Sequence, residues 1–426
     1  MNNYGLLDSN KKERFLVPAI YIILTLAIFS DILRIPDTKI TFFRLSLPFA
    51  LFIALVYKKY AKIVMGMTAM LFLLSSIQYC IFYKIQRPEL SFSISNAVKS
   101  MFLYFIMIII FGIMLILRDR EGERFEERFL NFIVIIGFVL IFIAILDILD
   151  RHFFDSGFFG GLKVDNENNY ACFFSALFPF FLAEYQKKRK LRDAIGIILI
   201  LITVVANDSK AALFGIVISA IIFLCISLGN ENRKKFFIYR YGLAIIAIIG
   251  IVSIIIINPS IHGYYLQDVI YQPIRRIIQN DPYPDYSSSI SFRTNTTNYC
   301  LREMAKGGFI GFGPGTTGIM LKHQFPELKY LWDSARNSET ISLHNPWLEI
   351  LLDFGIVAII AFFMALKYAF TRYFNRIKLS SLEKIRVAYI LSFPIWVISA
   401  SGIYTQYYLI TLMIFLLIAD DERVFE

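Results

Sequence analysis

The sequence has few charged residues for its length. Asp, Glu, Lys and Arg make up 18% of its 426 residues, whereas 57% are hydrophobic. Soluble domains carry nearer a quarter of charged residues, so a soluble protein could not hide this much apolar surface. The apolar residues also form runs of about 17 to 25, the length that a helix needs to cross a bilayer. We therefore expect an all-α polytopic membrane protein.

Other signals are also missing. The four cysteines show no CxxC spacing, which excludes a disulfide framework and a cysteine-based metal site. There is no GxxxxGK[ST] motif, and "GFGPG" at 311–315 is not GxGxxG. Any activated donor must therefore arrive already in the membrane. The net charge of +10 is explained by the topology of the spans, so we expect no nucleic-acid partner.

About twelve spans are predicted from the apolar runs. Basic segments such as "KKER", "QKKRKLR" and "NRKKFFIYR" fall on one side of them, which places both termini in the cytoplasm. The expected spans are 15–33, 40–57, 61–83, 93–117, 129–149, 167–185, 192–207, 210–228, 241–258, 344–370, 386–403 and 405–420.

One polar segment, 259–343 between spans nine and ten, breaks the pattern of short connections. Long loops in compact domains are often functional, and this one lies on the outer face. Residues 264–278 have the spacing of a short amphipathic helix on the membrane surface, and 281–289 resemble a turn. The chain is thus expected to be one membrane domain: spans one to nine in 1–258, an extracytoplasmic loop in 259–343, and the last three spans with a short tail in 344–426.

Several cations stand at membrane depth near the outer face. Arg44, Lys99 and Lys210 lie early in spans that run from outside to inside, and Arg293 and Arg302 lie in the outer loop. Basic side chains near a helix end can simply reach the headgroups, which is the alternative for each taken singly. Together they indicate an anionic ligand, with phosphate as the natural candidate.

The junction at 344–346 combines a rare histidine with helix-start signals. Pro346 suits the first position of a helix and Asn345 suits the N-cap, so His344 stands just outside a helix N-terminus. That end of a helix disfavours imidazolium, which makes a neutral, proton-accepting ring plausible. Asn345, Glu349 and Asp353 share one helical face that should point into the bundle. The alternative is an interfacial histidine that only contacts headgroups.

These motifs in order resemble the bacterial O-antigen ligase and polymerase family. "SISFRTNTTNYCLREMAKGGFIGFGPGTTG" is followed, after a gap, by "SLHNPWLEILLDFGIVAIIAFF". The family resembles this chain in having about twelve spans and a long outer loop before a late helix. "NDSKAALFG" resembles a Ser-Arg pair that opens a span, with Lys210 in place of the arginine, and Asn169 resembles a family asparagine. The residues that match the main signature in order are Arg293, Gly311, Gly313, Pro314, Gly315, His344, Asn345, Glu349 and Gly355.

The resemblance implies a membrane-embedded, GT-C-like glycosyltransferase that needs no metal or other cofactor. Its donor would be an undecaprenyl diphosphate-linked glycan at the outer face of the bacterial cytoplasmic (inner) membrane. His344 is the expected general base, and Arg293, Lys210 and Arg44 are expected to bind the diphosphate, with Arg293 also catalytic. The expected supporting or substrate-binding residues are Asn345, Glu349, Asn169, Gly313, Gly315 and Arg302.

A polymerase, which uses a lipid-linked repeat unit as acceptor, is the preferred activity. Membrane lipids, a flippase and a chain-length regulator of the same pathway are the expected partners. A ligase that transfers the glycan to lipid A-core is the first alternative. A transporter of anionic or lipid-linked solutes is the second, although the unusual residues here gather at one face rather than at the midplane. A non-catalytic assembly subunit is the third, and in it His344 would be dispensable.

Overall fold

The computed structural model describes residues 4–30, 33, 41–149, 167–206, 209–227, 289–306, 308–324, 343, 345–375, 379–397 and 403–418. The regular elements of these ranges are helices, which confirms the all-α class. The predicted ninth span, the segments 264–278 and 281–288, and His344 lie outside them. The N-terminal helices are α1 (Tyr4–Ile28), α2 (Phe42–Val56), α3 (Lys58–Ile81), η1 (Phe82–Gln86), α4 (Ile94–Glu121), η2 (Gly122–Arg124) and α5 (Phe125–Leu149).

The helices after α5 are α6 (Glu167–Lys188), α7 (Leu191–Ala206), α8 (Lys210–Ser227), α12 (Ser289–Ala305), η6 (Gly308–Ile310), α13 (Thr316–Gln324), α16 (Pro346–Phe354), α17 (Ile356–Asn375), α18 (Ser381–Trp396) and α19 (Ile403–Ile418). The helices α6, α7 and α8 follow the predicted ranges, whereas α12, η6 and α13 lie in the segment predicted as a polar loop. The last predicted spans show one clear difference. The predicted span 344–370 is two helices, because the chain turns at Gly355 with a positive φ of 56°. That conformation is strained for any residue with a Cβ, so the glycine allows the break.

Membrane-spanning capacity is clear for part of the bundle. Within the described ranges, Lys58–Gln86 and Ile94–Leu149 are long and apolar enough to cross a membrane, and four shorter apolar helices accompany them. Exposed apolar side chains line α3, with Met65, Phe72 and Leu73 all about half exposed or more. Such a surface suits lipid rather than water. These findings support a membrane protein, while the number of twelve spans is not confirmed.

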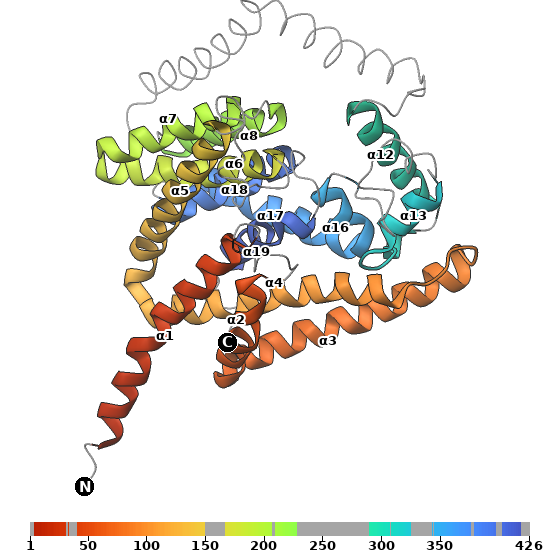
Figure 1. The fold of residues 1–426 in the computed structure, drawn as a ribbon, viewed down its shortest axis with the longest axis horizontal. Coiled ribbons are helices and arrows are strands. Elements are labelled where there is room, and N and C mark those ends of the chain that lie inside the picture. The colour runs from red at the N-terminus through yellow and green to blue at the C-terminus, as the bar shows by residue number, and fades with distance from the viewer. Residues whose placement is uncertain are drawn as a thin grey trace, which may run out of the picture.

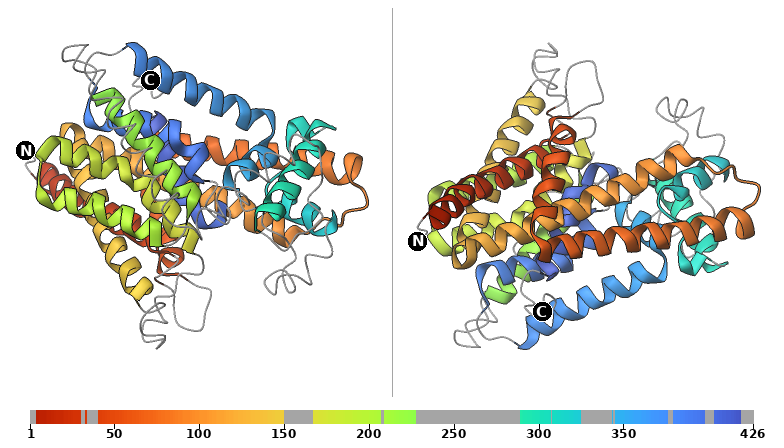
Figure 2. Two further views of the ribbon diagram at one scale, coloured as in Figure 1. Left: turned by 90° about the horizontal axis from the view of Figure 1, so that it is seen from above. Right: turned by 90° about the horizontal axis from the view of Figure 1, so that it is seen from below.

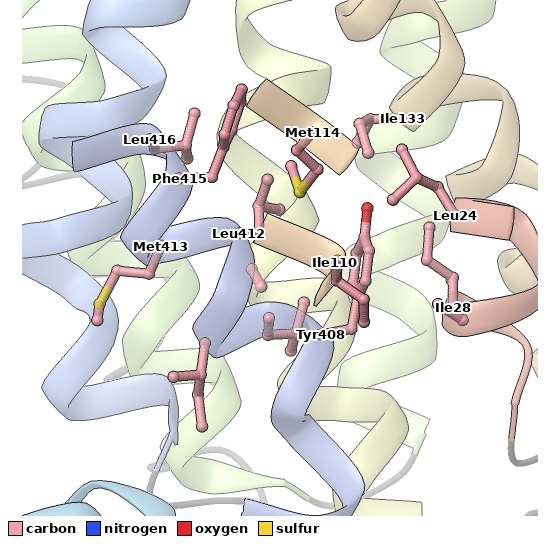
Figure 3. Close-up of a cluster of buried hydrophobic side chains, with 14 of the residues drawn as sticks. Leu24, Ile28, Ile110, Met114, Ile133, Tyr408, Leu412, Met413, Phe415 and Leu416 are labelled. Carbon is pink, nitrogen blue, oxygen red and sulfur yellow. The ribbon is translucent and has the colours of Figure 1, made fainter. Parts of the chain in front are cut away.

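The core of the bundle is built around α4, whose side chains are buried along most of its length. Figure 3 shows Ile110 and Met114 of α4 meeting Leu24 of α1, Ile133 of α5 and Leu412 of α19. Residues from four distant parts of the chain thus close one apolar cluster. On the other side of the bundle, α18 packs against α6 and α8.

The candidate site is carried at one end of a long hairpin. Helices α3 and α4 pack side by side and extend beyond the rest of the bundle (Figure 1). Both turned views show α12 and α13 beside the far end of this hairpin (Figure 2). The outer-loop helices therefore rest on a scaffold made of residues that precede them by more than 160 positions.

Candidate active site

The start of α16 is held by side chains on both sides of position 344. Asn345 is the N-cap, and its Oδ1 accepts a hydrogen bond from the backbone N–H of Leu348 at 3.2 Å. Glu349 is buried, and its Oε1 accepts a hydrogen bond from the backbone N–H of Leu343 at 3.2 Å. The predicted N-cap and Pro346 at the helix start are confirmed. Of the two residues that flank His344, Leu343 is therefore held by Glu349, and Asn345 is held by the cap that it forms. His344 itself is outside the described residues.

The other end of α16 is closed by the glycine turn 311–315. The N–H groups of Phe312 and Gly313 donate to the carbonyl oxygens of Leu352 and Asp353, at 2.8 and 3.1 Å. The last carbonyls of a helix have no partner within the helix, so the turn satisfies two of them. The turn and α16 therefore form one unit, which explains why the GFGPG and LEILLDFG motifs occur together.

Gly313 and Gly315 have conformations that this packing requires. Their φ angles are 91° and 80°, in a region that residues with a Cβ rarely adopt. A Cβ added at Gly313 would lie 2.8 Å from the ring of Tyr79, and one at Gly315 would collide with Ser100. Both glycines are thus structural residues of the turn.

Helices α3 and α4 hold the turn from the opposite side. Gln78 Nε2 donates to the carbonyl oxygen of Ile310 at 2.7 Å, and the Tyr79 hydroxyl donates to that of Pro314 at 2.7 Å. The Tyr104 hydroxyl of α4 donates to Asp353 Oδ2 at 2.8 Å. Asp353 is buried as predicted, at 4% exposure. These three α3 and α4 residues were not predicted from the sequence. A glutamine within an apolar run was a usable signal for Gln78, since polar groups at membrane depth need partners.

A small apolar cluster joins the loop helices to η1. It contains no residue of the main core and links segments that are far apart in the chain. Burying these side chains together contributes on the order of 1.5–3 kcal/mol for each large one. Its buried members are Phe82, Tyr83, Leu90, Cys300, Met304, Phe312, Met320, Leu321, Leu343, Leu348 and Leu352.

Helix α12 carries Arg293 and is held to the hairpin by a salt bridge. Glu303, 8% exposed, pairs with Arg87 at the end of η1 and with Lys306 at 2.9 Å. Arg293 is in the first part of α12, as the resemblance implied, with its side chain outside the described set. Arg302 is exposed, and its Nε donates to the carbonyl oxygen of Asn298 in the same helix.

The N-terminal parts of α6, α8 and α16 meet around the C-terminal half of α18. Trp347 lies 6.4 Å from Phe393, ring to ring, and Trp396 packs onto Gly215 of α8. The Ser175 hydroxyl of α6 donates to the carbonyl oxygen of Ala212 at 2.8 Å. Lys210 and Asn169 therefore begin helices at the same end of this group as Asn345. The side chains of Lys210 and Asn169 are themselves outside the described set.

Arg44 is in another part of the bundle, whereas Lys99 is next to Ser100, the α4 residue that lies against Gly315 of the glycine turn. Both are exposed, Arg44 in the first turn of α2 and Lys99 in the second turn of α4. Helix α2 packs on α1, α3 and α4. A contribution of Arg44 to diphosphate binding stays a prediction.

Comparison with known proteins bears on the same region. Residues 195–363 match the family model described as O-antigen ligase. This region is similar to O-antigen ligase. The resemblance drawn from the sequence motifs is thereby confirmed. No curated protein matches the chain.

The O-antigen ligase region covers the junction, the glycine turn, Arg293 and Lys210. It excludes Arg44, Asn169, and the α3 and α4 residues that bind the turn. The match supports a glycosyltransferase-like membrane enzyme of the O-antigen ligase or polymerase type. It does not distinguish polymerase from ligase.

Two features of the O-antigen ligase region limit its chemistry. Burial, with a smaller contribution from Glu349, raises the pKa of the Cys300 thiol well above its usual range, so this cysteine is a packing residue rather than a nucleophile. In the described ranges, no three His, Cys, Asp or Glu side chains gather as metal ligands would. Metal independence stays a prediction, because His344 and much of the loop lie outside those ranges.

Proposed function

We propose that this chain is a polysaccharide polymerase of the bacterial cytoplasmic membrane. It would transfer a glycan from an undecaprenyl diphosphate carrier to a sugar hydroxyl of a second lipid-linked repeat unit. One observation carries the proposal. In the O-antigen ligase region, the N-terminus of α16 next to position 344 is capped, and the glycine turn holds the other end of the same helix. Membrane lipids, a flippase and a chain-length regulator are the proposed partners, and the active site would face away from the cytoplasm.

The donor diphosphate would bind where helix N-termini and cations meet. Each helix N-terminus carries a partial positive charge and unpaired N–H groups, a combination that favours phosphate. Helices α6, α8 and α16 begin at one end of the group around α18, with Lys210 opening α8. Lys210, Arg293 and Arg44 are the proposed diphosphate ligands, and Asn169 and Arg302 are proposed to contact the glycan or carrier.

The acceptor would be activated by His344. A sugar hydroxyl becomes a nucleophile only as its proton leaves, and a positioned general base contributes on the order of 10²- to 10⁴-fold. The N–H of Leu343 is bound by Glu349 and that of Leu348 by Asn345, so the backbone that flanks the base is preorganised.

The proposed step balances without a cofactor. The acceptor oxygen forms a bond to the anomeric carbon while the bond from that carbon to the diphosphate oxygen breaks. The electron pair of the broken bond leaves with the diphosphate, and the hydroxyl proton goes to the imidazole of His344. Preorganised cations stabilise the growing charge on the diphosphate, the role that Mg²⁺ plays in other phosphate sites.

Ligase activity is the second candidate, because the matched family model is itself described as O-antigen ligase. Both activities use the same donor and the same bond changes and differ in the acceptor. His344→Ala in the native polysaccharide-producing host separates them. Single repeats on the final acceptor, without long chains, indicate a polymerase. Full-length polymer that accumulates on the carrier lipid indicates a ligase.

The matched control is His323→Ala, which removes an exposed histidine from α13 of the same region. It should leave the glycan unchanged. Normal glycan in the His344→Ala strain, with the protein present in the membrane, would show that His344 is not the base.

A purified assay tests the cations and the metal. Arg293→Ala should abolish turnover, whereas Arg293→Lys should retain part of it by keeping charge without the bidentate fork. Turnover of the wild type should persist in EDTA. Loss of turnover in EDTA that Mg²⁺ or Mn²⁺ restores would overturn the metal-independent mechanism.

A further inference from the structure

A buried carboxyl group on α16 has a partner far away in the sequence. Asp353 is 4% exposed, and its Oδ2 accepts the hydroxyl of Tyr104, which is 7% exposed. The two residues are 249 positions apart and join α16 to the long hairpin. Burying a carboxyl group costs free energy unless it is hydrogen-bonded, so the bond from Tyr104 offsets part of the cost of burying Asp353.

Main-chain and side-chain bonds act together at Asp353. Its carbonyl oxygen accepts the N–H of Gly313, and the preceding carbonyl of Leu352 accepts that of Phe312. The glycine turn therefore fixes where α16 ends along its axis. At the side of the helix, the Asp353 carboxyl accepts the Tyr104 hydroxyl and also the backbone N–H of Gly315. These side-chain bonds resist rotation of α16 about its axis, and the Tyr104 bond is the one that reaches the hairpin.

We propose that Tyr104 and Asp353 are positioning residues that set the rotation of α16 and thereby the place of position 344. This inference rests on the function proposed above. Asp353 lies about 12 Å along the axis from the N-cap Asn345 at 1.5 Å per residue, so neither residue of the pair needs to touch the substrate. They act through the helix and through its cap at Asn345.

The expected size of the effect follows from helix geometry. A side chain about 5 Å from the helix axis moves by about 2 Å when the helix turns by about 20°. A displacement of about 1 Å at a reacting group can cost on the order of 10²-fold in rate. Releasing α16 from Tyr104 should therefore lower kcat by about 10- to 100-fold with little effect on donor binding.

The first test uses Tyr104→Phe in the purified full-length protein with a lipid-linked glycan donor. Phenylalanine keeps the ring contact with Phe354, whose centroid lies 4.7 Å away, and removes only the hydroxyl. We expect kcat to fall about 10- to 100-fold while KM for the donor changes less than about threefold. The matched control is Tyr389→Phe, which removes a buried hydroxyl bond to the Leu409 carbonyl in the main bundle. It should lower thermal stability without lowering kcat.

Asp353 variants separate positioning from charge. Asp353→Asn keeps an oxygen that can accept the Tyr104 hydroxyl, so this variant should keep most of the wild-type activity. Asp353→Leu removes the acceptor, and combining it with Tyr104→Phe should cost no more than either change alone. An unchanged kcat in Tyr104→Phe, or Asp353→Asn as inactive as Asp353→Leu, would overturn the proposal.

Amide hydrogen exchange tests the coupling without any activity. The N–H groups of Leu343 and Leu348 are bound by Glu349 and Asn345, so they report on the start of α16. Tyr104→Phe should speed exchange in residues 343–349, and Tyr389→Phe should not. Unchanged exchange in Tyr104→Phe would refute the coupling. If the wild type fails to use a lipid-linked glycan while Tyr104→Phe still speeds exchange in residues 343–349, the proposed function is refuted and the coupling stands.

Discussion

Gly313→Ala is the change whose cost the structure defines best. The φ of 91° at this position is strained for alanine, by about 1–2 kcal/mol for a left-handed conformation. The new Cβ would also lie 2.8 Å from the Tyr79 ring, and overpacking of this kind costs about 1–3 kcal/mol. The variant should therefore lose about 2–5 kcal/mol of unfolding free energy. Because the turn holds Leu352 and Asp353, glycosyl transfer should fall as well.

Two other glycines separate the contributions. Gly122 has a φ of 53° with nothing within 4 Å of an added Cβ, so Gly122→Ala measures the conformational part alone. Gly66 lies inside α3 with the same open space and no positive φ, so Gly66→Ala should be neutral or stabilising by about 0.5–1 kcal/mol. Equilibrium unfolding in mixed detergent micelles compares the three variants. If Gly313→Ala costs no more than Gly122→Ala, the contact with Tyr79 has no energetic weight and the packing argument fails.

Three further changes test the support of the site. Arg87→Ala leaves the buried Glu303 with only the exposed Lys306 and should cost about 1–3 kcal/mol, with α12 cut faster by protease. Asn345→Ala removes the cap of α16 and should cost about 0.5–2 kcal/mol, measured by the same unfolding assay, with loss of activity. Burial raises the pKa of the Cys300 thiol, so at pH 8 maleimide should label the exposed Cys80 and should reach Cys300 only after unfolding.

Each of these has a control within the chain. Lys59 and Asp119 form an ion pair at 3.9 Å with both side chains about half exposed, so Lys59→Ala should cost less than about 1 kcal/mol. A similar cost for Arg87→Ala would contradict the buried-pair argument. Ser380 caps α18 as Asn345 caps α16, so Ser380→Ala should lower stability without lowering activity. Rapid labelling of Cys300 in the folded protein would contradict its burial.

Much of the local secondary structure of this protein was predictable from the sequence. The length of the apolar runs predicted the helices from α2 to α8 to within a few residues. Asn345 and Pro346 predicted the start of α16, because capping depends on groups only three or four residues apart. The motif order from Arg293 to Gly355 predicted the resemblance to the O-antigen ligase and polymerase family, which the match over 195–363 confirms. The break at Gly355 was missed, since an isolated glycine in an apolar helix is often tolerated.

What the sequence by itself determined is therefore the helices from α2 to α8, the capped start of α16 and the group of residues that is proposed to carry the chemistry. Only the tertiary structure decided how that group is held. Gln78, Tyr79 and Tyr104 bind the glycine turn and Asp353 from helices that precede them by more than 200 residues. No local pattern encodes such pairings, because a hydrogen bond between distant segments depends on which faces of two helices the whole bundle brings together. The apolar run predicts that α4 is a buried helix, and packing alone brings Tyr104 of that helix to Asp353.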